Sequence, residues 1–316
     1  MARTAPDGPW PPAGEGSLES ALRWGQDRLS GAGVEAPRRD ARLLLAAALE
    51  LSPGALMTAG ESRLAPGRRR RFEALVERRR RREPVSRILG RREFWSLDLA
   101  ITPATLDPRP DSETLVAAVL GRIGDPDRPR RVLDLGTGCG NLLLAVLAAL
   151  PGAWGVGLDR DTAALAAAAA NAGTLGLAAR SAFVAGDWGA ALAGDWDVIL
   201  CNPPYIRSAE IDGLAPEVAR FEPRGALDGG ADGLAAYRRV VPELPRLLAR
   251  DGLAALELGA GQAAEVAALA PGEGLEVLDC VRDLAEIQRC LLLGPAPRAA
   301  EKGHGGEKSS WNVRPL

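Results

Sequence analysis

Two short loops carry residue types that could do chemistry together. The first is glycine-rich and follows the apolar run Val132–Leu135, with an acid, Asp134, two residues before its first glycine. The second, Asn202-Pro203-Pro204-Tyr205, follows the hydrophobic run Val198–Cys201. We interpret them as two halves of one site, in which the first loop holds a methyl donor and the second presents an unreactive planar nitrogen to it.

The glycine loop has the composition of a nucleotide cradle, because glycine lets the backbone pass close to a ligand at φ values that other residues avoid. Its spacing is one residue tighter than the dinucleotide fingerprint G-x-G-x-x-G. Asp134 would repel a pyrophosphate but would attract an amino-acid ammonium group. The loop residues expected to contact the donor are Gly136, Thr137, Gly138, Cys139 and Gly140.

The next two predicted strands also end in acids, as expected of a site for a nucleoside-containing donor. Asp159 could accept hydrogen bonds from both ribose hydroxyls. Asp187 could accept from an adenine amino group, while Trp188 covers the face of the ring. An ordinary strand-to-helix turn is the alternative interpretation, and these acids make it much less favoured.

The acceptor loop suits an amide or arylamine nitrogen, whose lone pair is delocalised. The Asn202 side-chain oxygen and the Pro203 carbonyl could accept both N–H hydrogens, and Pro203 and Pro204 restrict the backbone before substrate arrives. Tyr205 could pack on the planar group. Orientation and proximity contribute about 7–11 kcal/mol to a bimolecular step, and the only histidine, His304, lies in the tail, which excludes histidine acid–base catalysis. By itself the loop could also be a rigid turn.

Strand and helix patterns alternate from Arg131 onward, which predicts an α/β fold with a doubly wound, mostly parallel sheet. In such sheets the fourth strand lies beside the first at the topological switch point. Asp161 is a good N-cap for the alanine-rich helix that follows it, and Pro242 and Pro245 should kink the helix before Leu253. The expected strands are Arg131–Leu135, Trp154–Leu158, Ser181–Ala185, Asp197–Cys201, Leu253–Leu258, Leu275–Asp279 and Gln288–Leu293.

The N-terminal part of the chain has a different pattern. We expect residues 1–16 to be mobile and residues 17–83 to form a helical domain that docks the substrate. The arginine runs 68–71 and 78–82 would be a solvated face or, alternatively, a docking surface for an acidic partner.

The remaining boundaries come from changes in pattern. Residues 84–110 are expected to be a β-hairpin linker whose turn is supplied by Gly90, and residues 111–294 form the α/β domain. Residues 295–316 lack periodicity and are expected to be disordered.

Bulk properties exclude several classes of protein. The 316-residue chain has a formal net charge of −2, so we expect no direct binding to nucleic acid. It contains no run of 18 apolar residues and no secretory signal pattern, so no membrane association is expected. The four cysteines (Cys139, Cys201, Cys280 and Cys290) have no C-x-x-C spacing, which argues against disulfides and metal sites and favours the cytoplasm.

Further motifs extend well beyond what methyltransferases share in general, and over roughly residues 18–294 the chain resembles the bacterial protein-(glutamine-N5) methyltransferases that modify peptide chain release factors. Besides the two loops, the resemblance is carried by Pro84-Val85, Ile88-Leu89-Gly90, Phe94-Trp95, Thr102-Pro103, Pro108-Arg109-Pro110-Asp111-Ser112-Glu113, Phe221-Glu222-Pro223, Ala226-Leu227-Asp228-Gly229-Gly230, Asp232-Gly233-Leu234, and Glu257, Gly259 and Gly261-Gln262.

The resemblance implies a small N-terminal helical domain, a β-hairpin linker and a seven-stranded Rossmann-like domain that binds S-adenosylmethionine. It implies methylation of the glutamine in the Gly-Gly-Gln loop of release factors, by a protein that we expect to be a monomer. Gly136–Gly140, Asp159, Trp188 and Asn202 would contact the donor, and Asn202–Tyr205 would hold the glutamine amide. Arg87 replaces the family's usual aromatic residue and Asp107 an apolar one, which brings the packing of the linker into question.

Three alternatives stay open from the sequence. A sister glutamine methyltransferase that acts on a large-subunit ribosomal protein would share both loops, and only the linker sequence Leu89–Trp95 favours the release-factor enzyme. An adenine-N6 DNA methyltransferase would share the acceptor loop but would need a basic target-recognition domain. A non-catalytic scaffold that only binds the donor is disfavoured by the presence of Asp134, Asp159 and Asn202.

Overall fold

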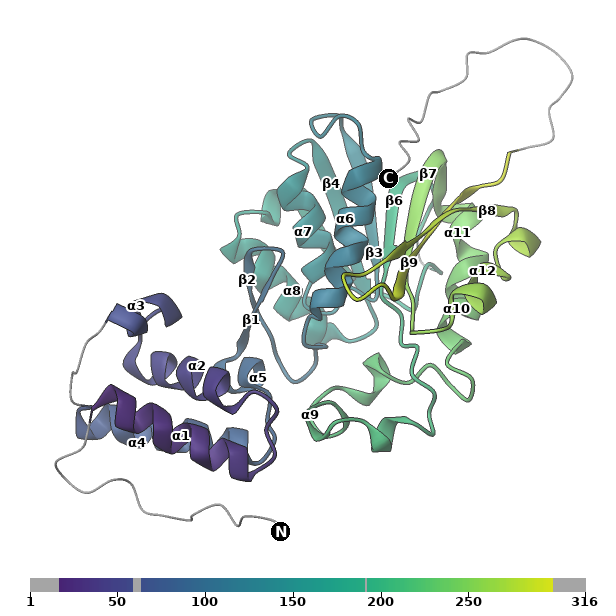
Figure 1. The fold of residues 1–316 in the computed structure, drawn as a ribbon. Coiled ribbons are helices and arrows are strands. Elements are labelled where there is room, and N and C mark those ends of the chain that lie inside the picture. Colours follow the sequence, from purple (N-terminus) through teal and green to yellow (C-terminus); the bar gives the residue numbers. More distant parts are fainter. Residues whose placement is uncertain (1–16, 59–63, 191, 298–316) are drawn as a thin grey trace, which may run out of the picture.

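A computed structural model describes residues 17–58, 64–190 and 192–297 of the chain. It consists of an N-terminal group of helices and a larger α/β domain, joined by a β-hairpin (Figure 1). The predictions of a mobile segment at 1–16 and of disorder at 298–316 lie outside the described residues. Pro295, which we expected to begin the disordered tail, instead ends the last strand of the sheet.

A seven-stranded mixed sheet forms the centre of the α/β domain, in the order β5-β4-β3-β6-β7-β9-β8. Within this sheet, the five strands β3 to β7 pair in parallel, and β9 pairs antiparallel with both β7 and β8. All seven predicted strands and the predicted fold class are confirmed. The strands are β3 (Arg130–Leu135), β4 (Ala153–Asp159), β5 (Ser181–Ala185), β6 (Trp196–Cys201), β7 (Leu248–Glu257), β8 (Leu275–Arg282) and β9 (Gln288–Pro295).

Both faces of the sheet are buried in its central strands, because helices cover each of them (Figure 1), whereas the edge strands β5 and β8 are partly exposed. In β6, Val198 and Leu200 belong to one hydrophobic cluster, while Ile199 and Cys201 belong to the other. This alternation follows from the period of two in a strand, and it explains why the sequence shows continuous apolar runs. One face is covered mainly by α6 (Glu113–Arg122) and α7 (Asn141–Ala149), with α8 (Thr162–Thr174) near the β5 edge; the other is covered by α10 (Ala235–Val240), α11 (Leu244–Leu247) and α12 (Ala263–Ala267).

The segment before β7 is interrupted as predicted. Residues 235–247 form α10, a 3₁₀ turn at Val241–Glu243 and then α11, because Pro242 and Pro245 lack the N–H groups that a continuous helix needs. The strand that follows begins at Leu248, five residues earlier than the predicted Leu253.

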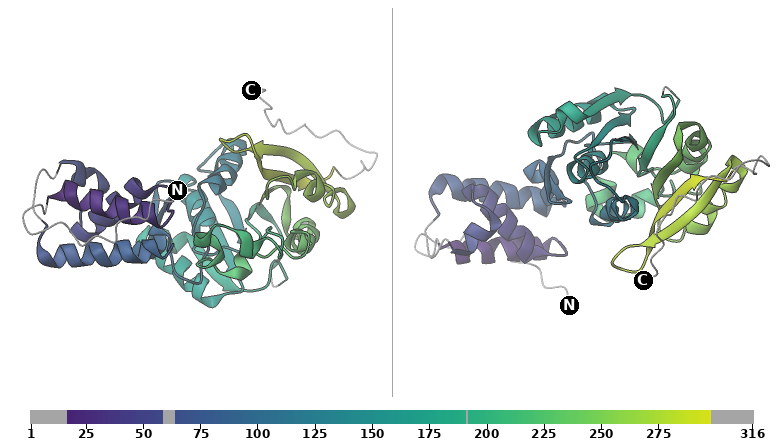
Figure 2. Two further views of the ribbon diagram at one scale, coloured as in Figure 1. Left: turned by 60° about the horizontal axis from the view of Figure 1, so that its bottom comes forward. Right: turned by 90° about the horizontal axis from the view of Figure 1, so that it is seen from above.

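The N-terminal helices lie together at one end of the molecule (Figures 1 and 2). Their shared core includes Leu44, Leu45, Phe72 and Val76. Gly25 permits close packing, since a Cβ atom there would lie 2.8 Å from the Phe72 ring. The predicted helical domain is confirmed, with α1 (Leu18–Gly31), α2 (Pro37–Leu49), α3 (Pro53–Thr58) and α4 (Pro66–Arg80).

The linker contains the predicted hairpin, but its turn lies elsewhere. Gly90, at φ +69°, ends the short helix α5 (Val85–Leu89), while Trp95 and Ser96 form the turn between β1 (Arg91–Phe94) and β2 (Leu97–Ala100). Both turn residues have positive φ, as a two-residue hairpin turn of type I′ requires. The Glu113 side chain accepts a hydrogen bond from the Trp95 N–H at 2.9 Å, and the Glu93 side chain accepts one from the Ser96 N–H at 2.7 Å. These bonds stabilise a turn that contains no glycine.

The expectation of a solvated arginine face on α4 is wrong for Arg79. Its side chain is buried and pairs with Asp40 at 2.7 Å and with Glu217 at 2.9 Å, while Arg82 pairs with the same Glu217 at 2.7 Å. Burial alone would raise the pKa of Glu217, but the two arginines lower it to about 2. Because Glu217 lies in α9 (Pro216–Ala219), these ion pairs attach the helical domain to the segment that follows the acceptor loop.

Arg87 and Asp107, the two residues that depart from the family pattern, both bind Glu222 in a second buried network. The Glu222 carboxylate, whose side chain is fully buried, accepts hydrogen bonds from Arg87, from Arg109 at 2.8 Å and from the Asp107 backbone at 3.1 Å. The Asp107 side chain accepts a hydrogen bond from Ser86. The linker is therefore well packed here, because the charge of Arg87 is paired.

We expect Glu222→Ala to destabilise the protein by about 3–5 kcal/mol, because it leaves the Arg87 charge buried without its partner. Urea denaturation measures this free energy of unfolding. The exposed Glu210, whose nearest cation is Arg207 at 3.9 Å, provides the matched control. A loss below about 1 kcal/mol, as for a surface ion pair, would contradict the assigned role.

Candidate active site

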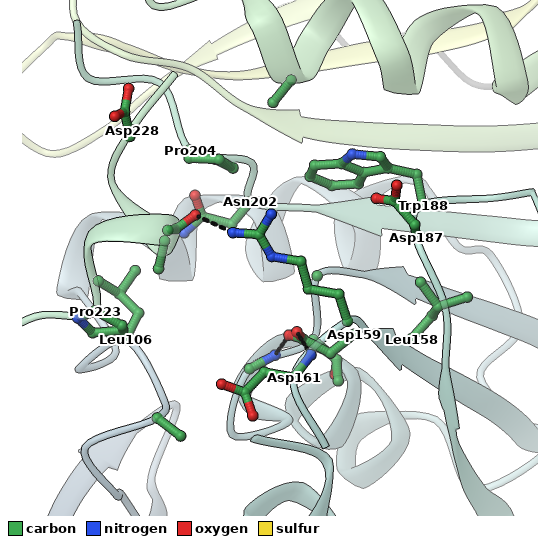
Figure 3. Close-up of a pocket in the computed structure, with 18 of the residues that line it drawn as sticks. Leu106, Leu158, Asp159, Asp161, Asp187, Trp188, Asn202, Pro204, Pro223 and Asp228 are labelled. Carbon is green, nitrogen blue, oxygen red and sulfur yellow. Dashed lines mark hydrogen bonds between the residues drawn. The ribbon is translucent and has the colours of Figure 1, made fainter. Parts of the chain in front are cut away.

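A pocket of about 700 Å³ opens at the carboxyl ends of β3, β4, β5 and β6 (Figure 3). Its volume lies within the range of small-molecule sites, about 300–1,000 Å³. The parallel pairing of β3 with β6 places Leu135 beside Cys201, so the glycine loop and the acceptor loop leave neighbouring strand ends. The predicted meeting of the two loops is thus confirmed.

The glycine loop has the backbone conformation that its composition predicts. Gly136, Gly138 and Gly140 have φ values of +77°, +56° and +83°. Gly136 and Gly138 line the pocket together with Thr137 and Cys139. Gly140 is buried behind the loop, where a Cβ atom would lie 3.0 Å from Leu144 and 3.3 Å from Ala168. Its role is therefore close packing, and it is not part of the pocket lining.

Asp159 lies at the base of the pocket with its carboxylate held in place (Figure 3). One oxygen accepts the Gly138 N–H and the other accepts the Asp161 N–H, each at 2.9 Å. A carboxylate oxygen can accept more than one hydrogen bond, so both retain capacity for a ligand. This geometry is compatible with a pair of ribose hydroxyls.

Asp187 and Trp188 form another wall of the pocket (Figure 3). Trp188 has a positive φ of +52°, and its ring lies 3.7 Å from where a Cβ atom of Gly136 would be. Asp187 pairs with Arg239, which also lines the pocket. A flat aromatic surface beside a carboxylate suits an adenine ring with its amino group.

Asp134 lies beneath the glycine loop and does not line the pocket, so the expected direct contact with a ligand ammonium group is not supported. Its buried carboxylate accepts a hydrogen bond from the Thr137 hydroxyl at 2.7 Å. Burial raises the pKa of Asp134 to about 7. Asp134 supports the loop from below, because only Leu135 separates it in the sequence from Gly136, which lines the pocket.

The acceptor loop divides between the pocket and the interior. Asn202 and Pro204 line the pocket, and the Asn202 side-chain N–H₂ donates to the Ser112 hydroxyl at 3.2 Å. Pro203 is buried, and the Tyr205 hydroxyl donates to Glu257 at 3.2 Å. Tyr205 does not line the pocket, so its expected stacking on the planar substrate group is not supported.

The sequence did not predict the wall of the pocket that lies opposite Trp188. Leu106 and the segment Pro223–Ala226, with Asp228, line the pocket there (Figure 3). Backbone hydrogen bonds of 2.9 Å from Ile206 to Leu227 and 2.8 Å from Gly229 to Ile206 hold this segment against the acceptor loop. The Phe221-Glu222-Pro223 motif could be recognised in the sequence, but only the fold shows that Pro223 lines the pocket.

The fold and the pocket together define a Rossmann-like methyltransferase domain that follows a helical domain. A family model described as "Methyltransferase small domain" matches residues 112–218, and one described as "PrmC N-terminal domain" matches residues 20–90. Among the described residues, no helix has the length and apolar character needed to cross a membrane.

Curated relatives named "Release factor glutamine methyltransferase" match nearly the whole chain. The protein from Rhodospirillum rubrum is 52% identical over 285 residues, which cover 89% of this chain and 87% of the relative. Those from Bradyrhizobium diazoefficiens and Caulobacter vibrioides are 46% and 42% identical and are each covered to 96%, with 89% and 87% of this chain aligned. The chain belongs to the release factor glutamine methyltransferase family.

Two buried carboxyl groups near the site should make the stability depend on pH. Burial raises the pKa of both Asp134 and Glu257 to about 7. The folded protein then binds more protons than the unfolded chain between about pH 5 and pH 8, so its free energy of unfolding should fall as the pH rises through this range.

Asp134→Asn should reduce this fall, because an amide cannot ionise. Urea denaturation at pH 5, 6, 7 and 8 measures the slope, and an exposed aspartate such as Asp251 supplies the matched substitution. Equal slopes for Asp134→Asn and the unmodified protein would show that Asp134 titrates normally in the folded state.

Proposed function

We propose that this protein transfers a methyl group from S-adenosylmethionine to the side-chain nitrogen N5 of the glutamine in the Gly-Gly-Gln loop of peptide chain release factors. The observation that carries the proposal is the position of Asn202 at the carboxyl end of β6, in the same pocket as the glycine loop of β3. That arrangement suits a methyl donor and a planar amide side by side. The family membership supports the nature of the substrate.

The residues of the pocket fit the donor. Asp159 would accept from the ribose hydroxyls, and Asp187 with Trp188 would hold the adenine. The glycine loop would pass close to the amino-acid end, with its shape supported by the hydrogen bond between Thr137 and Asp134. The bound sulfonium supplies an electrophilic methyl group, so the reaction needs no acid to protonate a leaving group.

The acceptor loop would orient the glutamine amide. The Asn202 side-chain oxygen would accept one N–H and the Pro203 carbonyl the other, which turns the nitrogen lone pair toward the methyl group. Gln262 supports the loop by donating to the Tyr205 carbonyl at 3.0 Å. The protein residues therefore contribute positioning, which is what a poorly nucleophilic nitrogen most requires.

The helical domain of residues 17–83 would dock the release factor, because four loop residues present too little surface to select a folded protein. The ion pairs of Glu217 attach this domain to the segment after the acceptor loop, which supports a docking role for the domain and a positioning role for the loop. We place the reaction in the cytoplasm, where release factors act, and assign it to a monomer.

We expect Asp159→Ala to weaken the binding of S-adenosylhomocysteine by about 1–3 kcal/mol, the cost of losing charge-assisted hydrogen bonds. Isothermal titration calorimetry measures this, with one site expected per chain. Asp125→Ala makes the same change of charge in the turn before β3, at the opposite end of the strand, and should bind normally. Unchanged affinity in Asp159→Ala would remove Asp159 from the ribose role.

We expect Asn202→Ala to slow methyl transfer at least 100-fold, which corresponds to about 2.7 kcal/mol of transition-state stabilisation. Single-turnover kinetics with a purified release factor measures the rate, and mass spectrometry locates the methyl group. Release-factor affinity should change little, because most of that contact lies elsewhere. A normal rate in this variant would reduce the Asn-Pro-Pro-Tyr loop to a structural turn.

A further inference from the structure

Asp228 lines the pocket, but donor binding as assigned above gives it no task. Asp187 and Trp188 form one wall of the pocket, whereas Asp228 lies on the same side as Pro204 of the acceptor loop (Figure 3). The Asp228 backbone forms a parallel bridge with Ile206, which directly follows the acceptor loop. Asp228 therefore belongs to the part of the pocket in which the methyl acceptor would lie.

The Asp228 carboxylate is held in place through one of its two oxygens. Oδ1 accepts hydrogen bonds from the Ser208 hydroxyl at 2.6 Å and from the Gly230 N–H at 3.0 Å. These two bonds lower the pKa of Asp228, so the group is ionised at neutral pH. Within the part of the chain that the structure describes, Oδ2 accepts no hydrogen bond.

The nearby Arg224 does not satisfy Oδ2. The Arg224 Nε atom lies 3.8 Å from Oδ2, which is beyond hydrogen-bonding distance, and Nη1 of the same guanidinium donates to Asp212 at 3.1 Å. A partly exposed ion pair of this length contributes little. Oδ2 therefore keeps the capacity to accept a hydrogen bond from a ligand in the pocket.

We propose that Asp228 is a substrate-binding residue that accepts a backbone N–H of the Gly-Gly-Gln loop and thereby places the glutamine side chain at Asn202. The proposal rests on the proposed function, because it names a further contact to the same substrate. It adds recognition of the loop backbone to recognition of the glutamine amide.

The composition of the substrate loop favours recognition through its backbone. Glycine has no side chain, so the two glycines offer an enzyme only their N–H and C=O groups. An ionised carboxylate accepts stronger hydrogen bonds than a neutral acceptor does. A contact of this kind holds the substrate equally in the ground state and in the transition state, so its loss should raise KM and leave kcat nearly unchanged.

Asp228→Asn tests this contact and preserves the local structure. The amide oxygen can replace Oδ1 as the acceptor for Ser208 and Gly230, which puts an N–H₂ group in the place of Oδ2. That group cannot accept the substrate N–H. We expect the KM for a purified release factor to rise at least tenfold, with kcat and the affinity for S-adenosylhomocysteine within about threefold of the wild type.

Asp232→Asn is the matched control for this variant. It makes the same substitution four residues further along, in an aspartate that pairs with Arg238 at 2.6 Å and does not line the pocket. Its KM and kcat should equal those of the wild type.

A change in the substrate identifies the N–H group that Asp228 binds. In three variants of the release factor, one residue of the Gly-Gly-Gln loop at a time is replaced by its α-hydroxy acid analogue, so that an ester oxygen takes the place of the N–H. One of the three should lower kcat/KM at least tenfold with the wild-type enzyme and less than twofold with Asp228→Ala, in which the partner is already absent. Asp228→Asn takes the place of Asp228→Ala, with the same expectation, if the alanine variant does not fold.

A wild-type KM in Asp228→Asn would overturn the proposal. Equal losses in both enzyme backgrounds for all three substituted release factors would also overturn it, because Asp228 would then support only the enzyme's own loops. If the wild-type enzyme does not methylate the unmodified release factor, the proposed function itself fails, which is a different outcome.

Discussion

The parallel pairing of β3 with β6 is the constraint on which the site depends. It brings together two loops that are more than sixty residues apart in the sequence and leaves both at one edge of the sheet. Each strand carries apolar side chains on both faces, so slipping either strand by one residue would move buried groups to the wrong cluster. Burial of the sheet therefore fixes the relative position of Gly136 and Asn202.

Buried charge is concentrated around this edge. Asp134 lies beneath the glycine loop, Glu257 behind the acceptor loop and Glu222 behind the wall that contains Pro223. A buried carboxylate is costly unless it is paired, so each one restricts its neighbours to geometries that satisfy it. The three carboxyl groups differ in their surroundings. Glu222 has two arginine partners, whereas burial raises the pKa of Asp134 and of Glu257. Each of these carboxylates adds a hydrogen bond that supports a neighbouring loop.

Several predictions from the sequence failed where the outcome depended on long-range partners. Gly90 looked like the hairpin turn, but Trp95 and Ser96 take that place because Glu93 and Glu113 bind their backbone N–H groups. The arginines of α4 looked like a solvated face, yet Arg79 is buried because Asp40 and Glu217 neutralise its charge. Local patterns contain no information on partners as distant as Glu113, which lies 18 residues from Trp95, or Asp40, which lies 39 residues from Arg79.

The sequence by itself determined the seven strands, the helical domain, the conformation of the glycine loop and the meeting of the two loops. These follow from hydrophobic periodicity, from glycine's access to positive φ and from the topology of parallel sheets. Only the tertiary structure decided which side chains face the pocket. It turned Asp134 and Tyr205 inward, brought Leu106 and Pro223 to the opposite wall, and placed Ser112 against Asn202. The physical reason is that side-chain direction depends on packing and hydrogen-bond partners from distant segments.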